Sequence, residues 1–134
     1  MINNILPPIV DANTQVLIVG SMPSRQSLDK QQYYGNTRNH FWPLIGEIIG
    51  QVIPDEYPAR LELLKKHGIG LWDTIQSCER QGSLDATIRN EIPNDFAWLF
   101  TVYPQIQAIF FNGGKSFAVF KKAYRVVCTC RERF

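Results

Sequence analysis

The sequence lacks an excess of charge of either sign. Its 14 Lys and Arg residues are nearly balanced by 12 Asp and Glu residues, so the formal net charge of the 134-residue chain is +2. Proteins that hold nucleic acid tightly without regard to its sequence carry a strongly basic surface. Such a surface is excluded here, and any contact with nucleic acid must be made by a few local groups.

Metal-binding motifs and long apolar runs are also missing. The three cysteines, Cys78, Cys128 and Cys130, do not have the C-x-x-C spacing of a zinc ribbon or an iron–sulfur run, and only two histidines are present. We therefore expect reduced structural thiols, no metal and no cofactor. The residues after Met1 lack the cationic start and the apolar core of a signal peptide. We expect a cytoplasmic monomer without membrane contact.

Two motifs that would point to familiar hydrolases are incomplete. Residues 112–116 read Asn-Gly-Gly-Lys-Ser, but a P-loop needs a further glycine at the position that Ile109 occupies. Residues 20–24 read Gly-Ser-Met-Pro-Ser and lack the closing glycine of a nucleophile elbow. A strand-to-helix turn is the favoured interpretation of the glycine pair at 113–114, although its backbone N–H groups could bind an anion.

Short apolar runs alternate with stretches of helical periodicity along a chain of single-domain length. Runs of this kind that stop at glycine or polar residues are typical of buried parallel strands. Strands that alternate with helices predict a parallel sheet covered on both faces. The fold class is therefore α/β, a three-layer α/β/α sandwich with a short parallel sheet of three to four strands, forming one domain over residues 1–134. We expect strands at 15–20, 69–75, 106–111 and, at the sheet edge, 126–130. We expect helices at 39–52, 58–67, 94–103 and 116–124, the third of them with an N-cap at Asn94. A loop is expected at 21–27 and a long connection at 76–93.

A candidate site lies at the carboxyl edge of this sheet. Ligands of open α/β sheets bind beyond the carboxyl ends of the strands, which here means the loops after Gly20, Ile75 and Phe111. Between the first loop and the next helix, residues 33–42 mix aromatic, amide and arginine side chains. An extracted nucleobase needs an aromatic face to stack on and an amide at its edge, and Tyr34 and Asn39 supply these types. The alternatives are a helix N-cap for Asn39 and core packing for Tyr34.

An ordered set of short motifs covering about residues 8–124 resembles the hypoxanthine-DNA glycosylases, a branch of the uracil-DNA glycosylase superfamily. The motifs are Gly20-Ser-Met-Pro-Ser24, Ser27-Leu28, Tyr33-Tyr34, Asn39, Phe41-Trp42, Gly70-Leu-Trp-Asp73 and Cys78-x-Arg80-x-Gly82-Ser83-x-Asp85. The resemblance implies a monofunctional enzyme that hydrolyses the N-glycosidic bond of deaminated bases in DNA, namely hypoxanthine, with uracil as a second candidate.

The resemblance also implies roles for individual residues. In the similar mismatch-specific uracil glycosylases an Asn replaces Met22 and positions the attacking water. Here the essential amide is implied at Asn39, and the stacking aromatic at Tyr34. The remaining implied contacts are with the base for Gly20, Ser21, Met22 and Pro23, through their backbone, and with the DNA for Ser24, Ser27 and Arg38.

The resemblance ends near Tyr124. Members of the family continue into a fourth strand and a loop like Leu-Pro-Ser-Thr-Ser-Pro that wedges into DNA, whereas residues 125–134 here read Arg-Val-Val-Cys-Thr-Cys-Arg-Glu-Arg-Phe. We therefore expect weaker action on duplex DNA, where base flipping is costly. Two further functions stay open at this stage: a non-catalytic nucleic-acid-binding remnant and a small-molecule nucleotide-binding domain.

Overall fold

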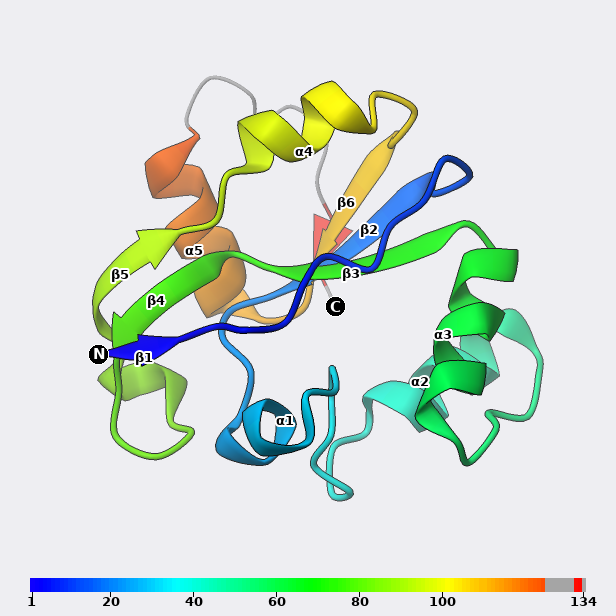
Figure 1. Ribbon diagram of the computed structural model, residues 1–134, viewed down its shortest axis with the longest axis horizontal. Helices are drawn as coiled ribbons and strands as arrows, with labels where there is room; N and C mark the ends of the chain where they lie inside the picture. The colour runs from blue at the N-terminus through cyan, green and yellow to red at the C-terminus, as the bar shows by residue number, and fades with distance from the viewer. Residues whose placement is uncertain (125–131, 134) are drawn as a thin grey trace.

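The computed structural model describes residues 1–124 and 132–133. Their elements are, in chain order, β1 (Ile2–Asn3), β2 (Val16–Gly20), α1 (Arg25–Lys30), α2 (Phe41–Ile49), α3 (Tyr57–Lys66), β3 (Ile69–Asp73), β4 (Ile75–Glu79), the 3-10 turn η1 (Asp85–Thr87), β5 (Arg89–Pro93), α4 (Phe96–Val102), β6 (Ala108–Phe111), α5 (Gly114–Ala123) and β7 (Glu132–Arg133). Figure 1 shows their arrangement. No helix among these residues is long and apolar enough to cross a membrane.

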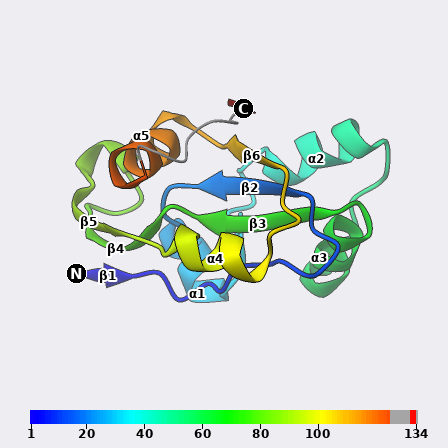
Figure 2. The ribbon, with the colours of Figure 1, turned by 90° about the horizontal axis from the view of Figure 1, so that it is seen from above.

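A four-stranded parallel sheet forms the middle layer, with strand order β3-β2-β6-β7. Helices α2 and α5 lie on one side of it and α3 and α4 on the other (Figure 2). Continuous burial of β2 on both faces explains its apolar run, because helices cover a parallel sheet on both sides. The expected three-layer α/β class is confirmed.

The connection expected at residues 76–93 is instead a second sheet. Strands β1, β4 and β5 pair antiparallel in the order β1-β4-β5, with η1 in the β4–β5 connection. The register of β4 against β5 shifts between Ile75 and Ser77 and again between Ser77 and Glu79. Such bulges interrupt the alternation of buried and exposed residues by which a strand is recognised in a sequence. The long strand expected at 69–75 is therefore two strands that belong to different sheets.

Several expected boundaries also change. The loop expected at 21–27 ends in α1, because the Ser24 side chain accepts a hydrogen bond from the backbone N–H of Ser27 and caps a helix that starts at Arg25. Asp95 caps α4 in place of the expected Asn94. Helix α3 ends just before Gly68 as expected, and that glycine has a φ of +70°. The edge strand expected at 126–130 lies outside the described residues.

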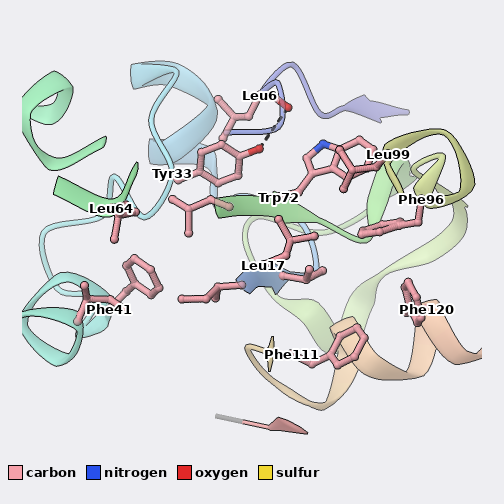
Figure 3. Packing of buried hydrophobic residues seen from close by; sticks show 14 of the residues in the cluster. Leu6, Leu17, Tyr33, Phe41, Leu64, Trp72, Phe96, Leu99, Phe111 and Phe120 are labelled. Atoms are coloured by element: carbon pink, nitrogen blue, oxygen red, sulfur yellow. Dashed lines mark hydrogen bonds between the residues drawn. The ribbon is translucent and has the colours of Figure 1, made fainter. Parts of the chain in front are cut away.

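The main core fills both sides of the parallel sheet (Figure 3). Leu17 of β2 is fully buried at its centre. On one side Trp72 meets Phe96 of α4, with ring centroids 4.7 Å apart, and on the other Phe111 meets Phe120 of α5 at 5.1 Å. A second, smaller cluster joins Met22 to residues of β4 and α5. Cys78, the cysteine within the described part of the chain, is a buried free thiol in that cluster.

The free edge of β3 is closed by the N-terminal segment. Ile9 exchanges two backbone hydrogen bonds with Leu71, its N–H donating over 2.8 Å and its carbonyl accepting over 3.0 Å. Gly70 makes this approach possible, because a Cβ there would stand 2.8 Å from the Ile9 carbonyl oxygen and 2.9 Å from Thr14 Cγ2. The edge is thereby protected from pairing with another chain.

Gly70→Ala is expected to destabilise the fold by about 1–3 kcal/mol, since the added methyl group forces backbone and side chain apart. Gly114→Ala is the matched control, because a Cβ at that helix start has no neighbour within 4 Å. It should change the free energy of unfolding by no more than about 0.5 kcal/mol. Denaturant unfolding of both variants measures the difference, and equal effects would show that the close approach is unimportant.

Candidate active site

The carboxyl ends of the three central strands converge on one cavity of about 280 Å³. Gly20 ends β2, Asp73 ends β3, and Asn112 directly follows β6. Ile75, named above as a strand end, instead begins β4 and is fully buried. The cavity is lined by Gly20, Ser21, Met22, Pro23, Ser24, Ser27, Tyr33, Tyr34, Asn39, Asp73, Ser83, Asp85 and Asn112.

Gly20 lets the side chains of Asp73 and Tyr34 approach the floor of the cavity because it has no side chain of its own. A Cβ on Gly20 would lie 2.7 Å from Oδ1 of Asp73 and 3.5 Å from the hydroxyl oxygen of Tyr34. The strand ends are held in place by Thr74, whose backbone N–H donates to the Gly20 carbonyl over 2.8 Å and whose hydroxyl lies 2.9 Å from the Ser116 carbonyl of α5.

Asp73 is a buried carboxyl group with an incomplete set of partners. Its Oδ2 accepts a hydrogen bond from the Asn4 side chain over 3.0 Å, and its backbone carbonyl accepts one from the Asn94 side chain over 2.8 Å. No described residue donates to Oδ1. Burial, followed by the nearby negative charge of Asp85, raises the pKa of Asp73 to about 7, although the Asn4 hydrogen bond lowers it. Close to neutral pH this carboxyl therefore exists in both protonation states.

The segment at residues 33–40 forms one wall and is held by three helices. The Tyr33 N–H donates to the hydroxyl of Tyr57 in α3 over 2.9 Å, and the Gly35 N–H donates to Ser27 Oγ in α1, also over 2.9 Å. The Tyr33 hydroxyl reaches the carbonyl oxygens of Pro7 at 2.6 Å and Leu6 at 3.4 Å, the latter drawn in Figure 3. At its end this wall runs directly into α2.

Tyr34 contributes both a ring and a hydroxyl group to the cavity. Its ring stacks on Phe41, with centroids 3.7 Å apart and planes 11° from parallel, so at most one face is free for another ring. Its hydroxyl accepts a hydrogen bond from Asn112 Nδ2 over 3.3 Å. Burial is the main cause that raises the pKa of Tyr34, so the hydroxyl is neutral at physiological pH.

Asn39 has a structural role, although not that of the helix N-cap that the sequence left open. Its Oδ1 accepts the backbone N–H of Phe41, the first residue of α2, over 2.8 Å and so forms a turn just before the helix, whose N-cap residue is His40. This bond fixes which side of the amide is oxygen. The Nδ2 group, which donates to no described residue, belongs to an exposed side chain that lines the cavity. The amide thus offers donors to a ligand while it stabilises the turn before the helix.

The first loop is fixed by the β4–β5 connection. Ser21 donates to Asp85 Oδ2 over 2.9 Å, and the Arg25 N–H donates to Ser83 Oγ over 3.0 Å. Met22 packs its side chain into the second core cluster, which leaves its backbone for the cavity. The loop and the connection therefore form one wall.

The three side chains expected to contact DNA differ in their surroundings. Ser27 is 2% exposed and accepts the Gly35 N–H, so it holds the wall of the cavity in place and is too buried to contact DNA at the surface. Ser24 caps α1 but remains at the cavity. Arg38 is exposed and does not belong to the cavity lining among the described residues.

Sequence reasoning missed four polar lining residues: Asp73, Ser83, Asp85 and Asn112. Three of them lie in the Gly70–Asp73 and Cys78–Asp85 motifs, to which no role had been given. A charged residue that ends an apolar strand, as Asp73 does, was the available signal. Asn112 begins the loop after Phe111, which was expected to border the site, but the residue itself had been given no role.

Comparisons with known proteins agree on one family. The model of the uracil DNA glycosylase superfamily matches residues 7–132. A hypoxanthine DNA glycosylase of Methanosarcina acetivorans is 45% identical over 117 residues, which are 87% of this chain and 74% of the relative. One of Methanosarcina barkeri is 44% identical over 111 residues, 82% and 70% of the two chains. The solution NMR structure of a candidate uracil DNA glycosylase from M. acetivorans is similar with a TM-score of 0.83 and 41% identity, covering 95% of this chain and 79% of that one.

The raised pKa of Asp73 predicts a pH-dependent stability difference between the wild type and Asp73→Asn. The carboxyl loses its proton near pH 3.8 when unfolded and near pH 7 when folded, so raising the pH through this window favours the unfolded wild type. The unfolding free energy of the variant minus that of the wild type should therefore rise from about pH 4 to about pH 7 and then stay level. Denaturant unfolding across this range measures it. A constant difference would mean that the Asp73 pKa is ordinary in the folded protein.

Proposed function

The chain belongs to the uracil-DNA glycosylase superfamily, and we propose that it is a monofunctional DNA glycosylase that releases hypoxanthine, with uracil as a second base, from deaminated DNA. Relatives that are 44% and 45% identical are named hypoxanthine DNA glycosylase. The observation that carries the proposal is a cavity in which an amide, an aromatic ring and a carboxyl group meet at the carboxyl ends of the sheet.

The cavity suits a base better than a nucleotide. Its volume of about 280 Å³ is just below the range of ligand pockets, which starts at about 300 Å³. Its lining within the described residues includes two carboxyl groups, Asp73 and Asp85, but no Lys or Arg. Carboxylates repel a phosphate and do not repel a neutral base. These features favour entry of a flipped base whose phosphates stay outside, and they disfavour a small-molecule nucleotide.

The chemistry requires positioning more than a reactive nucleophile. As the N-glycosidic bond breaks, the sugar becomes oxocarbenium-like and the departing base gathers negative charge, while water adds to C1′. Oriented donors at the base and a fixed geometry supply most of the acceleration in such a site. No lysine of the described chain lines the cavity to form a Schiff base, in agreement with a hydrolytic enzyme that leaves an intact abasic site.

Each wall supplies one part of this arrangement. Asn39 donates from Nδ2 to the base edge, Tyr34 stacks with its remaining face, and the backbone of Gly20, Ser21, Met22 and Pro23 borders the base. The orientation of Asn39 favours contact with the base over activation of water, because its oxygen already accepts the Phe41 N–H. Ser24, at the cavity, and Arg38, outside its lining, contact the DNA, and Ser27 contributes by holding Gly35.

Release of base from deoxyinosine- and deoxyuridine-containing oligonucleotides, single- and double-stranded, tests the function. Expected products are the free base and a strand that breaks only after alkali treatment. Borohydride should trap no covalent adduct, and an adduct would refute the monofunctional mechanism. Tight binding of deoxyinosine DNA without release of base would identify a binding module and refute the proposal.

The two roles of Asn39 can be separated by substitution. Asn39→Asp keeps an oxygen that accepts the Phe41 N–H but loses the Nδ2 donor, whereas Asn39→Ala loses both. We expect both variants to lose at least about a hundredfold in single-turnover rate on deoxyinosine DNA. Only Asn39→Ala should lower the free energy of unfolding, by roughly 1 kcal/mol.

Asn39→Ser controls for the charge that Asp adds, because serine is neutral and its hydroxyl oxygen can also accept a nearby backbone N–H. It should be as inactive as the other two variants and as stable as the wild type. If Asn39→Ser or Asn39→Asp retains full activity, the role of the residue is only structural.

The stacking role of Tyr34 is tested by replacing it with leucine and with phenylalanine, neither of which is branched at Cβ. Tyr34 has a φ of 55°, so β-branched substitutes would add strain. Tyr34→Leu should weaken binding to abasic or deoxyinosine DNA by roughly 1–3 kcal/mol, because the ring is lost. Tyr34→Phe keeps the ring and loses only the acceptor for Asn112, so its effect should be under about 1 kcal/mol. Equal losses, in proteins shown to be folded by their thermal melting, would rule out stacking.

A further inference from the structure

The proposed mechanism leaves the buried carboxyl group of Asp73 without a task. It lies at the end of β3 in the floor of the cavity, 4% exposed and next to Gly20. Asn4 occupies its Oδ2 and Asn94 its backbone carbonyl. Oδ1 receives no hydrogen bond from the described residues. Oδ1 is therefore the oxygen of Asp73 that is free to pair with a ligand atom in the cavity.

Asn4 determines where the proton of a neutral Asp73 resides. Its Nδ2 donates to Oδ2, and a proton on Oδ2 would face this donor. The stable neutral form therefore carries its proton on Oδ1, the oxygen that is unclaimed. Such a group presents an O–H donor to the cavity.

The groups around Asp73 favour this neutral form. The titratable side chains that interact with it are Asp85 and the three tyrosines Tyr33, Tyr34 and Tyr57, and no cation is among them. Burial and the negative charge of Asp85 both oppose ionisation and raise the pKa of the carboxyl to about 7. Proteins can use a carboxylic acid kept neutral in this way as a hydrogen-bond donor.

Resting on the proposed glycosylase function, we propose that Asp73 recognises the leaving base by donating a hydrogen bond from Oδ1–H to the carbonyl oxygen that deamination creates, O6 of hypoxanthine or O4 of uracil. Adenine and cytosine, from which these two bases arise, carry an amino group there, which donates and so opposes an O–H donor. The same bond strengthens as the base gains negative charge, whereas an ionised Asp73 would repel it.

The proton of Asp73 stays on Oδ1 throughout the reaction. The glycosidic electron pair goes to the base, the oxygen of water bonds to C1′, and the proton that this water releases ends on the base. Asp73 thus contributes recognition and charge stabilisation without transferring a proton.

Asp73→Asn and Asp73→Ala form a matched pair for the test. In Asp73→Asn the donor of Asn4 holds the amide oxygen, so the new Nδ2 faces the cavity and donates at every pH. Asp73→Ala has no donor. Single-turnover cleavage of deoxyinosine DNA and binding of free hypoxanthine, by calorimetry or NMR, are measured for all three proteins at about pH 6 and about pH 8.

For the wild type we expect cleavage and binding to weaken roughly tenfold between these pH values, as the carboxyl ionises. In Asp73→Asn this ratio should approach one. Asp73→Ala should be at least about tenfold weaker than the wild type at pH 6 in both assays. A merely structural Asp73 would change stability and leave the pH ratio as in the wild type.

The outcomes separate the two proposals. If the wild type cleaves DNA but Asp73→Asn keeps the pH dependence, or Asp73→Ala matches the wild type, the role of Asp73 is wrong and the glycosylase function stands. If the wild type cleaves no substrate but binds hypoxanthine with a pH dependence that Asp73→Asn removes, the base contact stands and the catalytic function is wrong. Absence of both cleavage and binding overturns both.

Discussion

The approach of the Asp73 carboxyl group to Gly20 is the contact on which the rest of the site depends. Oδ1 occupies space that any side chain at position 20 would need, since a Cβ would stand 2.7 Å away. The two residues are register partners in the parallel pair β2–β3, so the contact is set by the sheet itself. Thr74 then ties these strand ends to α5 through the carbonyl groups of Gly20 and Ser116. A cavity with a carboxyl floor follows directly from this packing.

The walls of the cavity are made rigid by bonds that have no part in the chemistry. Ser27 and Tyr57 hold the segment with Tyr34, and Ser83 and Asp85 hold the first loop. Asn39 is oriented by its hydrogen bond from the Phe41 N–H at the start of α2. Groups fixed in advance need no reorganisation during the reaction, which is how polar side chains contribute most to a rate. The structural and functional uses of these side chains are therefore complementary.

Much of the parallel sheet could be predicted from the sequence because burial on both faces leaves an uninterrupted apolar run, as in β2. The antiparallel sheet could not, because the register shifts at Ser77 break the period of β4. Asn39 and Tyr34 stood out because their side-chain types match a base and lie close together in the sequence. Asp73 reaches the same cavity from the end of β3 and Asp85 from η1, and their meeting depends on tertiary contacts that no local pattern records.

The near balance of charge over the chain fits a cavity that selects a neutral group. A base pocket must be dry enough for one hydrogen bond to discriminate an oxygen from an amino group, and a dry pocket disfavours any ionised side chain in it. An amide such as Asn112 avoids this cost, but its Nδ2 already donates to the Tyr34 hydroxyl. Asp73 avoids it differently, because burial raises its pKa to about 7, so that a neutral form is available near neutral pH, and Asn4 selects the oxygen that carries the proton. Asn4, which follows β1 and lies outside the cavity lining, therefore sets which oxygen of Asp73 can donate to a ligand. The placement of the N-terminal segment is in this way coupled to the choice of base.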